Sequence, residues 1–340
     1  MSCASFDSPQ PIPSHRVLQQ AAEWFTVLDS GEATDADRRR WEAWLAASPE
    51  HQAAWRYVEH VSRRFHPIKA SPQKQSALTA YQLATGMLAR RRQTLLGLAA
   101  LAGGGLAGWG VWRNTGLPES AWSWVADYRS GTGEIRRITL PDGTRVWLNA
   151  LSAFNHDYQP GRRLLRLVRG EILIDTAADP RGRPFYVETP QGRLQALGTR
   201  FTVRLDGPET YLAVYGGAVK VRAAGTGVSA VIPAGRQTRF TREAFAAVQA
   251  ADPAREAWTR GLLVARNIPL ADVVRELRRY YPGHLSLAPE VAGLRVMGGY
   301  PVNDPDKVLA MLESVLPIQI KRTLSWWASI EPRQDLGSSH

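Results

Sequence analysis

Cysteine is almost absent from this 340-residue chain, and Cys3 is its single example. One cysteine cannot form an internal disulfide, so each folded part must be held together by its apolar core. The seven histidines are scattered, and none belongs to an HExxH or Cys/His set, so we expect no metal site. A P-loop pattern is also missing. We therefore expect no cofactor.

Charged residues are absent over the 20 positions Gln93–Trp112. A helix of that length, rising about 1.5 Å per residue, spans roughly 30 Å, the thickness of a bilayer's hydrocarbon core. Basic residues 90–92 precede it, and Trp109 and Trp112 lie near its far end, as in a membrane-spanning helix. A buried helix of a soluble core is disfavoured, because each of its six glycines would cost about 1 kcal/mol against alanine. A signal peptide is excluded, because it would start at the N-terminus.

Basic residues gather before this stretch, with seven lysines and arginines between residues 63 and 92. Only Arg113 and Arg129 follow it before Gly131. The positive-inside rule therefore predicts a cytoplasmic N-terminus and an exported C-terminal part. The net charge of +11 would suit an acidic partner, but the densest basic cluster is explained by the membrane surface. No nucleic-acid-binding motif is present, and we predict no direct nucleic-acid contact.

The residues before the uncharged stretch predict a small all-α bundle at 17–90, after a Ser- and Pro-rich tail at 1–16 that we expect to be disordered. The first helix ends at Gly31. Thr34 with Asp37 predicts a capping box for the second helix, and Ser48 before Pro49 predicts the start of the third. A weaker helical stretch at 76–88 leads to the membrane.

Four tryptophans stand out in this bundle: Trp24, Trp41, Trp44 and Trp55. The simplest interpretation is that they form its core. A domain this small has little interior for four indole rings, so we expect one or two of them at a partner site, as on other small helical bundles.

The pattern changes at 127–245, where short β-branched runs alternate with Gly and Pro turns about every ten residues. This predicts an all-β domain and leaves a sandwich and a barrel open. The predicted strands are 134–140, 145–148, 164–168, 171–175, 185–189, 199–205, 209–215, 218–221, 228–232 and 237–240.

Residues 254–331 predict a small α+β module of two helices against a sheet. The first helix opens with Pro269 at its first position, and Asn303 or Asp304 caps the second. The predicted strands are 261–264, 285–287, 294–300, 318–323 and 326–330. The predicted fold is therefore multidomain: an all-α bundle, one transmembrane helix at 93–112, an all-β domain and this module.

Asp142 and Glu171 are candidates for the carboxylate pair of a glycoside hydrolase. Structural roles are favoured for both, because Asp142 lies in a predicted turn and Glu171 follows Gly170 between strands. We therefore expect no enzyme of this kind.

Gly198 and Thr199 offer one local reaction, self-cleavage. If the turn is strained, the Thr199 hydroxyl could attack the Gly198 carbonyl and form an ester that water then hydrolyses. The alternative is a plain tight turn in which only glycine fits.

Several ordered segments resemble the FecR-like transmembrane regulators. In the β-rich part they are Ile138–Phe154, Leu167–Asp175, Arg183–Pro190, Leu197–Arg204, Tyr215–Val221 and Pro233–Gln237. Ala21–Gly31 and Arg38–Val58 resemble the cytoplasmic domain of the same family. Trp258–Tyr281 and the residues C-terminal to this segment resemble the secretin/TonB short N-terminal module.

The resemblance implies an anti-sigma factor of iron-siderophore signalling in the inner membrane, single-pass, with a cytoplasmic N-terminus and a periplasmic C-terminus. Its implied partners are an extracytoplasmic-function sigma factor, bound by the tryptophan-rich bundle, and the signalling domain of a TonB-dependent outer-membrane receptor. Some family members cleave themselves at the Gly-Thr that matches Gly198-Thr199.

A second hypothesis is a membrane-tethered periplasmic domain that binds or hydrolyses carbohydrate. A tether would not need a folded, tryptophan-rich domain before its anchor, so the helical bundle favours the signalling regulator.

Overall fold

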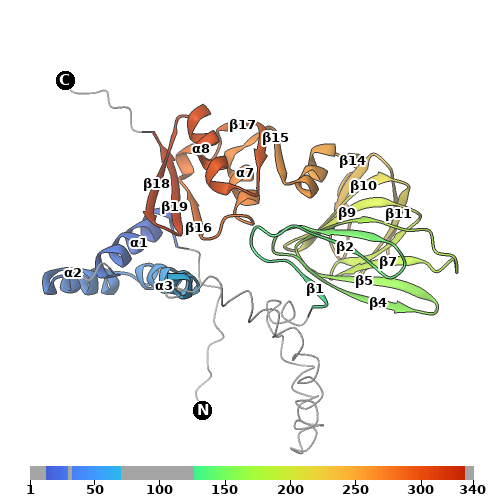
Figure 1. Cartoon of the computed structure of the whole chain (residues 1–340), viewed down its shortest axis with the longest axis horizontal. Helices are drawn as coiled ribbons and strands as arrows, with labels where there is room; N and C mark the ends of the chain where they lie inside the picture. Colours follow the sequence, from blue (N-terminus) through green and yellow to red (C-terminus); the bar gives the residue numbers. More distant parts are fainter. Residues whose placement is uncertain (1–12, 30–32, 70–125, 334–340) are drawn as a thin grey trace, which may run out of the picture.

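The computed structural model describes residues 13–29, 33–69 and 126–333. Figure 1 shows a helical part, a β-rich part and an α+β module, which follow one another in the predicted order. The predicted membrane helix at 93–112, the weak helical stretch at 76–88 and most of the tail at 1–16 lie outside the described residues. Within the described ranges, no helix is long and apolar enough to cross a membrane.

Three helices form the N-terminal part: α1 (His15–Asp29), α2 (Asp35–Ala46) and α3 (Pro49–Lys69). The predicted capping box of α2 is confirmed, because the Thr34 hydroxyl accepts from the Asp37 N–H at 3.2 Å and the Asp37 carboxylate accepts from the Thr34 N–H at 3.0 Å. Ser48 caps α3 by accepting from the Glu50 N–H at 3.1 Å. Local side-chain chemistry thus fixes where both helices begin.

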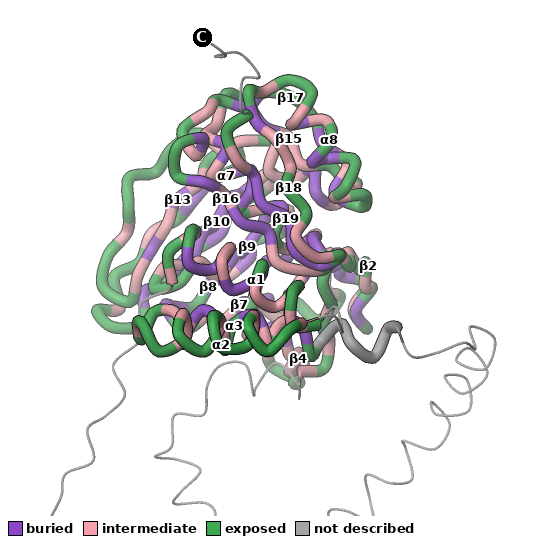
Figure 2. Tube along the Cα trace, turned by 90° about the vertical axis from the view of Figure 1, so that its left-hand side faces the viewer, coloured by how far each residue is buried: buried purple, intermediate pink, exposed green. Residues whose placement is uncertain are grey.

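Helices α1 and α3 pack through small residues, since Ala21, Ala22 and Ala54 are completely buried beside Val58. Alanine lets two helix backbones approach closely and leaves little room for larger side chains. Helix α2 has no buried residue and lies on the outside (Figure 2). The large aromatic residues of the bundle therefore cannot all lie in its interior.

Residues 128–250 of the described chain form a sandwich of two seven-stranded sheets. In hydrogen-bonding order, the first sheet is β1 (Tyr128–Arg129), β4 (Ala153–Gln159), β5 (Arg162–Arg169), β7 (Phe185–Thr189), β8 (Gly192–Ala196), β11 (Ala218–Ala223) and β12 (Ser229–Pro233). The second is β14 (Gln249–Ala250), β13 (Arg236–Phe240), β10 (Glu209–Gly216), β9 (Arg200–Asp206), β6 (Glu171–Asp175), β3 (Arg145–Leu148) and β2 (Arg136–Thr139). Paired strands are antiparallel except for β5 and β7.

Both sheets point side chains into one core. Phe154 and Phe185 come from the first sheet, Phe201 and Phe240 come from the second, and all four are at most 1% exposed. A single core between two facing sheets is the arrangement of a sandwich. Of the two architectures that the sequence left open, the sandwich is therefore the one formed.

The sequence predicts β3, β6 and β7 with their observed bounds but does not predict β4 or β8. Strand β4 has no β-branched residue, and β8 begins at Gly192 and has one large aliphatic side chain. Gly192 is needed there, because a Cβ at this position would lie 2.4 Å from the Arg222 carbonyl oxygen on β11. Close approach of two backbones therefore overrides strand propensity.

The C-terminal module contains two short sheets and two α-helices. Strands β15 (Leu262–Pro269) and β17 (Arg295–Pro301) form one sheet, and β16 (His284–Leu287), β19 (Trp327–Pro332) and β18 (Ile318–Leu324) form the other. The helices are α7 (Leu270–Leu277) and α8 (Pro305–Val315), with short 3₁₀ helices η1 (Pro253–Arg260) and η2 (Pro289–Val291). All of these elements except η1 bury side chains in one core, as predicted for an α+β module.

The two predicted helix starts of the module differ in their outcome. Asp304 caps α8 by accepting from the Lys307 N–H at 3.0 Å, which decides between the two candidates. Pro269 precedes α7 as its N-cap, one position earlier than predicted.

Helix α1 lies beside β18 and β19, on the outer face of the three-stranded sheet (Figure 1). Val17 and Leu18 of α1 join a buried cluster with Trp326 and Trp327. The Lys321 ammonium lies 3.1 Å from the Glu23 carboxylate, and the Tyr57 hydroxyl lies 2.9 Å from His284 Nδ1. The helical part and the C-terminal module are thus in direct contact.

Candidate functional site

Three of the four candidate tryptophans lie close together on α2 and α3. The rings of Trp41 and Trp55 are 5.0 Å apart, and Trp44 stacks on His51 at 4.4 Å. Trp44 Nε1 also donates to Gln20 Oε1 at 3.3 Å, which ties α2 to α1. Trp24 takes no part in the ring contacts among the described residues.

All four tryptophans are half-buried, so none is a completely buried core residue and none stands free. Trp41 Nε1 is buried and has no hydrogen-bond partner among the described residues. Partly exposed aromatic rings are enriched at protein interfaces. The cluster of Trp41, Trp44 and Trp55 is therefore the best candidate for a partner site on this bundle.

Gly198 and Thr199 lie between β8 and β9, where the chain passes from one sheet to the other. Gly198 has a φ of +74°, a left-handed conformation that glycine adopts without strain. The backbone angle therefore agrees with the tight-turn interpretation and supplies no evidence of strain at Gly198.

The surroundings of Thr199 are nevertheless unusual. Thr199 is only 4% exposed, and its hydroxyl has no hydrogen-bond partner among the described residues. Gly217 lies against the preceding carbonyl, because a Cβ at Gly217 would be 2.2 Å from the Gly198 oxygen. A dry, unpartnered hydroxyl thus lies next to a tightly enclosed peptide group.

Asp142 and Glu171 do not form a common site. Strands β3 and β6 pair with Arg145 opposite Asp175 and Leu148 opposite Ile172. Asp142 precedes β3 and Glu171 begins β6, so they lie at opposite ends of this pair, at least about 10 Å apart at 3.3 Å per residue. Glycoside hydrolases need two carboxylates that converge on one bond. The hydrolytic version of the tethered-domain hypothesis therefore lacks this pair.

Asp142 has a structural role in the turn between β2 and β3. Its side chain is 2% exposed and lies 2.7 Å from the guanidinium of Arg163, which is 7% exposed. Burial acts to raise the pKa of Asp142, but hydrogen bonds from Thr144 and Arg163 outweigh it and lower the pKa below its usual value. The carboxylate thus stays ionised as the partner of a buried arginine.

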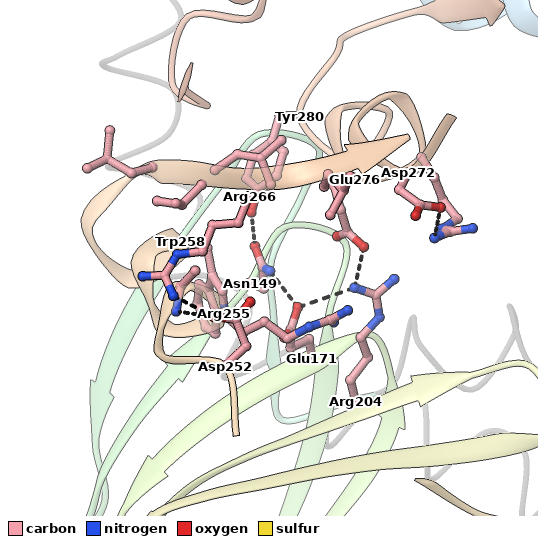
Figure 3. Close-up of a pocket in the computed structure, with 16 residues that line it drawn as sticks. Asn149, Glu171, Arg204, Asp252, Arg255, Trp258, Arg266, Asp272, Glu276 and Tyr280 are labelled. Carbon is pink, nitrogen blue, oxygen red and sulfur yellow. Dashed lines mark hydrogen bonds and ion pairs between the residues drawn. The ribbon is translucent and has the colours of Figure 1, made fainter. Parts of the chain in front are cut away.

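Glu171 belongs to a charge network between the sandwich and the C-terminal module (Figure 3). It accepts from Asn149 at 2.8 Å and from Arg279 at 3.3 Å. Arg204 donates to Glu276 of α7 at 2.6 Å and lies 3.9 Å from Glu171. Asn149, Glu171, Arg204 and Glu276 border a cavity of about 170 Å³ that also contacts η1 and β15. Because every one of these buried charges has an opposite partner, the network holds two domains together.

No three His, Cys, Asp or Glu side chains converge into a metal-binding group in the part of the chain that the structure describes. The scattered histidines accordingly lie in different environments. His284, for example, is half-buried beside Arg278 and His15, and desolvation is the main reason that its pKa falls to about 4.

Comparison with known proteins bears on both the helices and the sandwich. Residues 126–220 match the family model described as FecR protein, which runs from the start of the sandwich into β11. This chain carries a FecR domain. Residues 19–61, within α1 to α3, match the model DUF4880, described as a domain of unknown function. The resemblance to FecR-like proteins is thus confirmed.

Two crystal structures of a proposed anti-sigma factor from Parabacteroides distasonis, at 2.50 Å and 1.65 Å resolution, are similar to this chain. Each is 23% identical, with a TM-score of 0.51, and the match covers 60% of this chain and 97% or 98% of the other. At that identity the similarity shows a shared fold. No curated protein shows significant similarity to the chain.

The FecR match includes Gly198 and Thr199, which the sequence singled out, whereas the DUF4880 match includes all four tryptophans. The sequence did not reveal the inter-domain network around Glu171. Its members are far apart in the chain, and Arg279 pairs with Glu171 across 108 positions.

Proposed function

We propose that this chain is a single-pass regulator in the inner membrane that binds an extracytoplasmic-function sigma factor. The observation that carries the proposal is the combination in one chain of a DUF4880 match at 19–61 and a FecR match at 126–220, on either side of the uncharged stretch at 93–112. A signal that starts at the FecR domain can then reach a protein bound to the helices.

In this proposal the helical part binds the sigma factor through the cluster of Trp41, Trp44 and Trp55. Its half-buried rings supply apolar area for a partner. Aromatic anchors of this kind contribute a large share of binding energy at interfaces. Trp24 is a weaker candidate, because it makes no ring contact with the other tryptophans among the described residues.

The sandwich and the C-terminal module form the periplasmic part and receive the signalling domain of a TonB-dependent receptor loaded with a siderophore. The Glu171 network supports a sensor that moves as one body, because it joins the two domains through buried ion pairs. The roles of iron and of the receptor in this proposal follow from the resemblance to FecR-like regulators.

If the stretch at 93–112 crosses the membrane, α1 cannot contact β18 in the same chain, because a bilayer about 30 Å thick would lie between the helical part and the C-terminal module. In the inserted chain, the apolar face of α1 and the outer face of the three-stranded sheet are therefore both open to partners.

Thiol labelling tests the proposed crossing. Cys3 is the only cysteine, so a membrane-impermeant maleimide on spheroplasts should label the natural chain after lysis and not before. An M297C variant in a C3S background should be labelled without lysis, because Met297 is 75% exposed in the C-terminal module. Equal labelling of both chains in intact spheroplasts would contradict the topology.

A transcription reporter tests the regulatory role. Removing residues 13–69 from the chain should change expression from promoters of one extracytoplasmic-function sigma factor and leave promoters of the housekeeping sigma factor unchanged. No change at any such promoter would count against the proposal.

We also propose self-cleavage between Gly198 and Thr199. Supporting observations are the buried, unpartnered Thr199 hydroxyl and the enclosure of the Gly198 carbonyl by Gly217. The expected products begin at Met1 and at Thr199, and a T199A variant should remain intact.

A further inference from the structure

Thr176 forms hydrogen bonds with both the N–H and the carbonyl group of Thr199. It follows directly after β6, and its N–H donates to the Thr199 carbonyl at 3.0 Å. Its hydroxyl donates to the same carbonyl at 3.1 Å and accepts from the Thr199 N–H at 2.8 Å. One side chain therefore contacts both polar groups of the Thr199 backbone.

The peptide bond between Gly198 and Thr199 is held from two directions. Thr176 contacts its nitrogen, while Gly217 lies against its carbonyl oxygen. The same Cβ at Gly217 that would clash with this oxygen would also lie 2.9 Å from Thr199 Cγ2. The peptide and the Thr199 side chain are thus confined in a space closed by β6 on one side and by the start of β11 on the other.

We propose that Thr176 is a positioning residue for cleavage of the Gly198–Thr199 bond, an inference that rests on the self-cleavage proposed above. Its hydroxyl accepts from the N–H of the leaving nitrogen and donates to the Thr199 carbonyl, so it fixes the orientation of the peptide that is to be cleaved. No other part of the proposed function depends on Thr176.

The reaction has two balanced steps. First, Thr199 Oγ1 bonds to the Gly198 carbonyl carbon, the bond from that carbon to the Thr199 nitrogen breaks, and the hydroxyl proton ends on the nitrogen. Second, water adds to the ester, which yields the Gly198 carboxylate and restores the Thr199 hydroxyl. The proton that the amine gains comes from the Thr199 hydroxyl itself, while Thr176 Oγ1 accepts from the Thr199 N–H at 2.8 Å and holds the nitrogen in position.

The test uses the full chain, made by cell-free synthesis in lipid nanodiscs, with cleavage followed on gels and the new N-terminus identified by mass spectrometry. T176V removes the hydroxyl at nearly constant volume and should slow cleavage by at least about tenfold, because the peptide then loses the hydrogen bond that orients it toward the nucleophile. T176S keeps the hydroxyl and should cleave at close to the natural rate.

T189V is the matched control. The Thr189 hydroxyl makes the same pair of bonds to a backbone, since it accepts from the Gly192 N–H and donates to the Gly192 carbonyl, both at 3.2 Å. Loss of the Thr189 hydroxyl should leave the rate of cleavage unchanged. Thermal unfolding of T176V in a T199A background, where no cleavage can occur, measures any effect on stability separately.

Hydroxylamine distinguishes positioning from a general loss of structure, because it cleaves esters and not amides. It should accelerate fragment formation in the natural chain and in T176S, where the ester forms, and have little effect on T176V. A T176V chain that cleaves as fast as the natural chain would overturn the role of Thr176 and leave self-cleavage standing. Equal slowing of cleavage in T176S and T176V would also overturn the positioning role of Thr176. If the natural chain stays intact, both self-cleavage and the role of Thr176 are overturned.

Discussion

Replacing Asp142 by alanine should destabilise the sandwich strongly. The change leaves the Arg163 guanidinium, 7% exposed, without the one carboxylate that pairs with it among the described residues. Removing one member of a buried ion pair typically costs about 3–5 kcal/mol. Arg163 keeps hydrogen bonds to the carbonyl of Arg183 at 3.0 Å and 3.2 Å and to that of Ala177 at 3.1 Å. We therefore expect the lower end of that range, about 3 kcal/mol.

For a domain of this size, such a loss should lower the midpoint of thermal unfolding by roughly 10 °C. Circular dichroism or urea unfolding of the D142A chain measures it. The matched control is D175A, which removes partly exposed ion pairs with Arg145 and Arg200; the side chains of Asp175, Arg145 and Arg200 are 26%, 48% and 35% exposed. Exposed pairs contribute at most about 1 kcal/mol. If D142A and D175A had equal effects, the structural role of Asp142 would be refuted.

Three further predictions concern the other surfaces and turns. W44A should weaken sigma-factor capture while helical circular dichroism persists, because α1 and α3 pack through alanines. The control W147A, in the sandwich, should leave capture unchanged, and loss of the helical signal in W44A would remove Trp44 from the candidate site. In urea unfolding, G217A should destabilise the chain by more than G207A. Both glycines have positive φ, but an added Cβ would lie 2.2 Å from the Gly198 oxygen at position 217 and in open space at position 207. Equal losses of unfolding free energy would contradict the enclosure of the Gly198 carbonyl. Burial lowers the pKa of His284 from 6.5 to about 4, so the unfolded chain binds the proton first and the free energy of unfolding should fall as pH drops from 6.5 to 4. In the membrane-inserted chain, where α1 and α3 cannot cover His284, NMR titration should show a pKa closer to 6.5. A pKa near 4 in that chain would contradict the proposed crossing.

Local signals in the sequence predicted much of the fold. Thr34 and Ser48 cap helices through side-chain bonds to residues at most three positions away, so a short window contains the information. Strands such as β6, with a continuous apolar run, are equally local. Glycine at the Gly198 turn was also visible, because a left-handed backbone favours it.

Long-range contacts determined what the sequence pattern missed. Strand β8 forms because Gly192 allows β11 to approach, and no propensity of β8 itself reports that. The predicted turn at Asp142 was recognised, but its ion pair with Arg163 joins two different sheets and could not be read from spacing. Thr176 is likewise 23 positions from Thr199 and gave no signal as a neighbour of the Gly-Thr site.

Co-purification of the full-length chain with the sigma factors of the cell tests the proposed regulator most directly. A tagged chain extracted in mild detergent should capture one extracytoplasmic-function sigma factor in a near-stoichiometric complex, and W44A should capture less of it. Recovery of no sigma factor by a chain whose helices are shown to be folded would contradict the proposal.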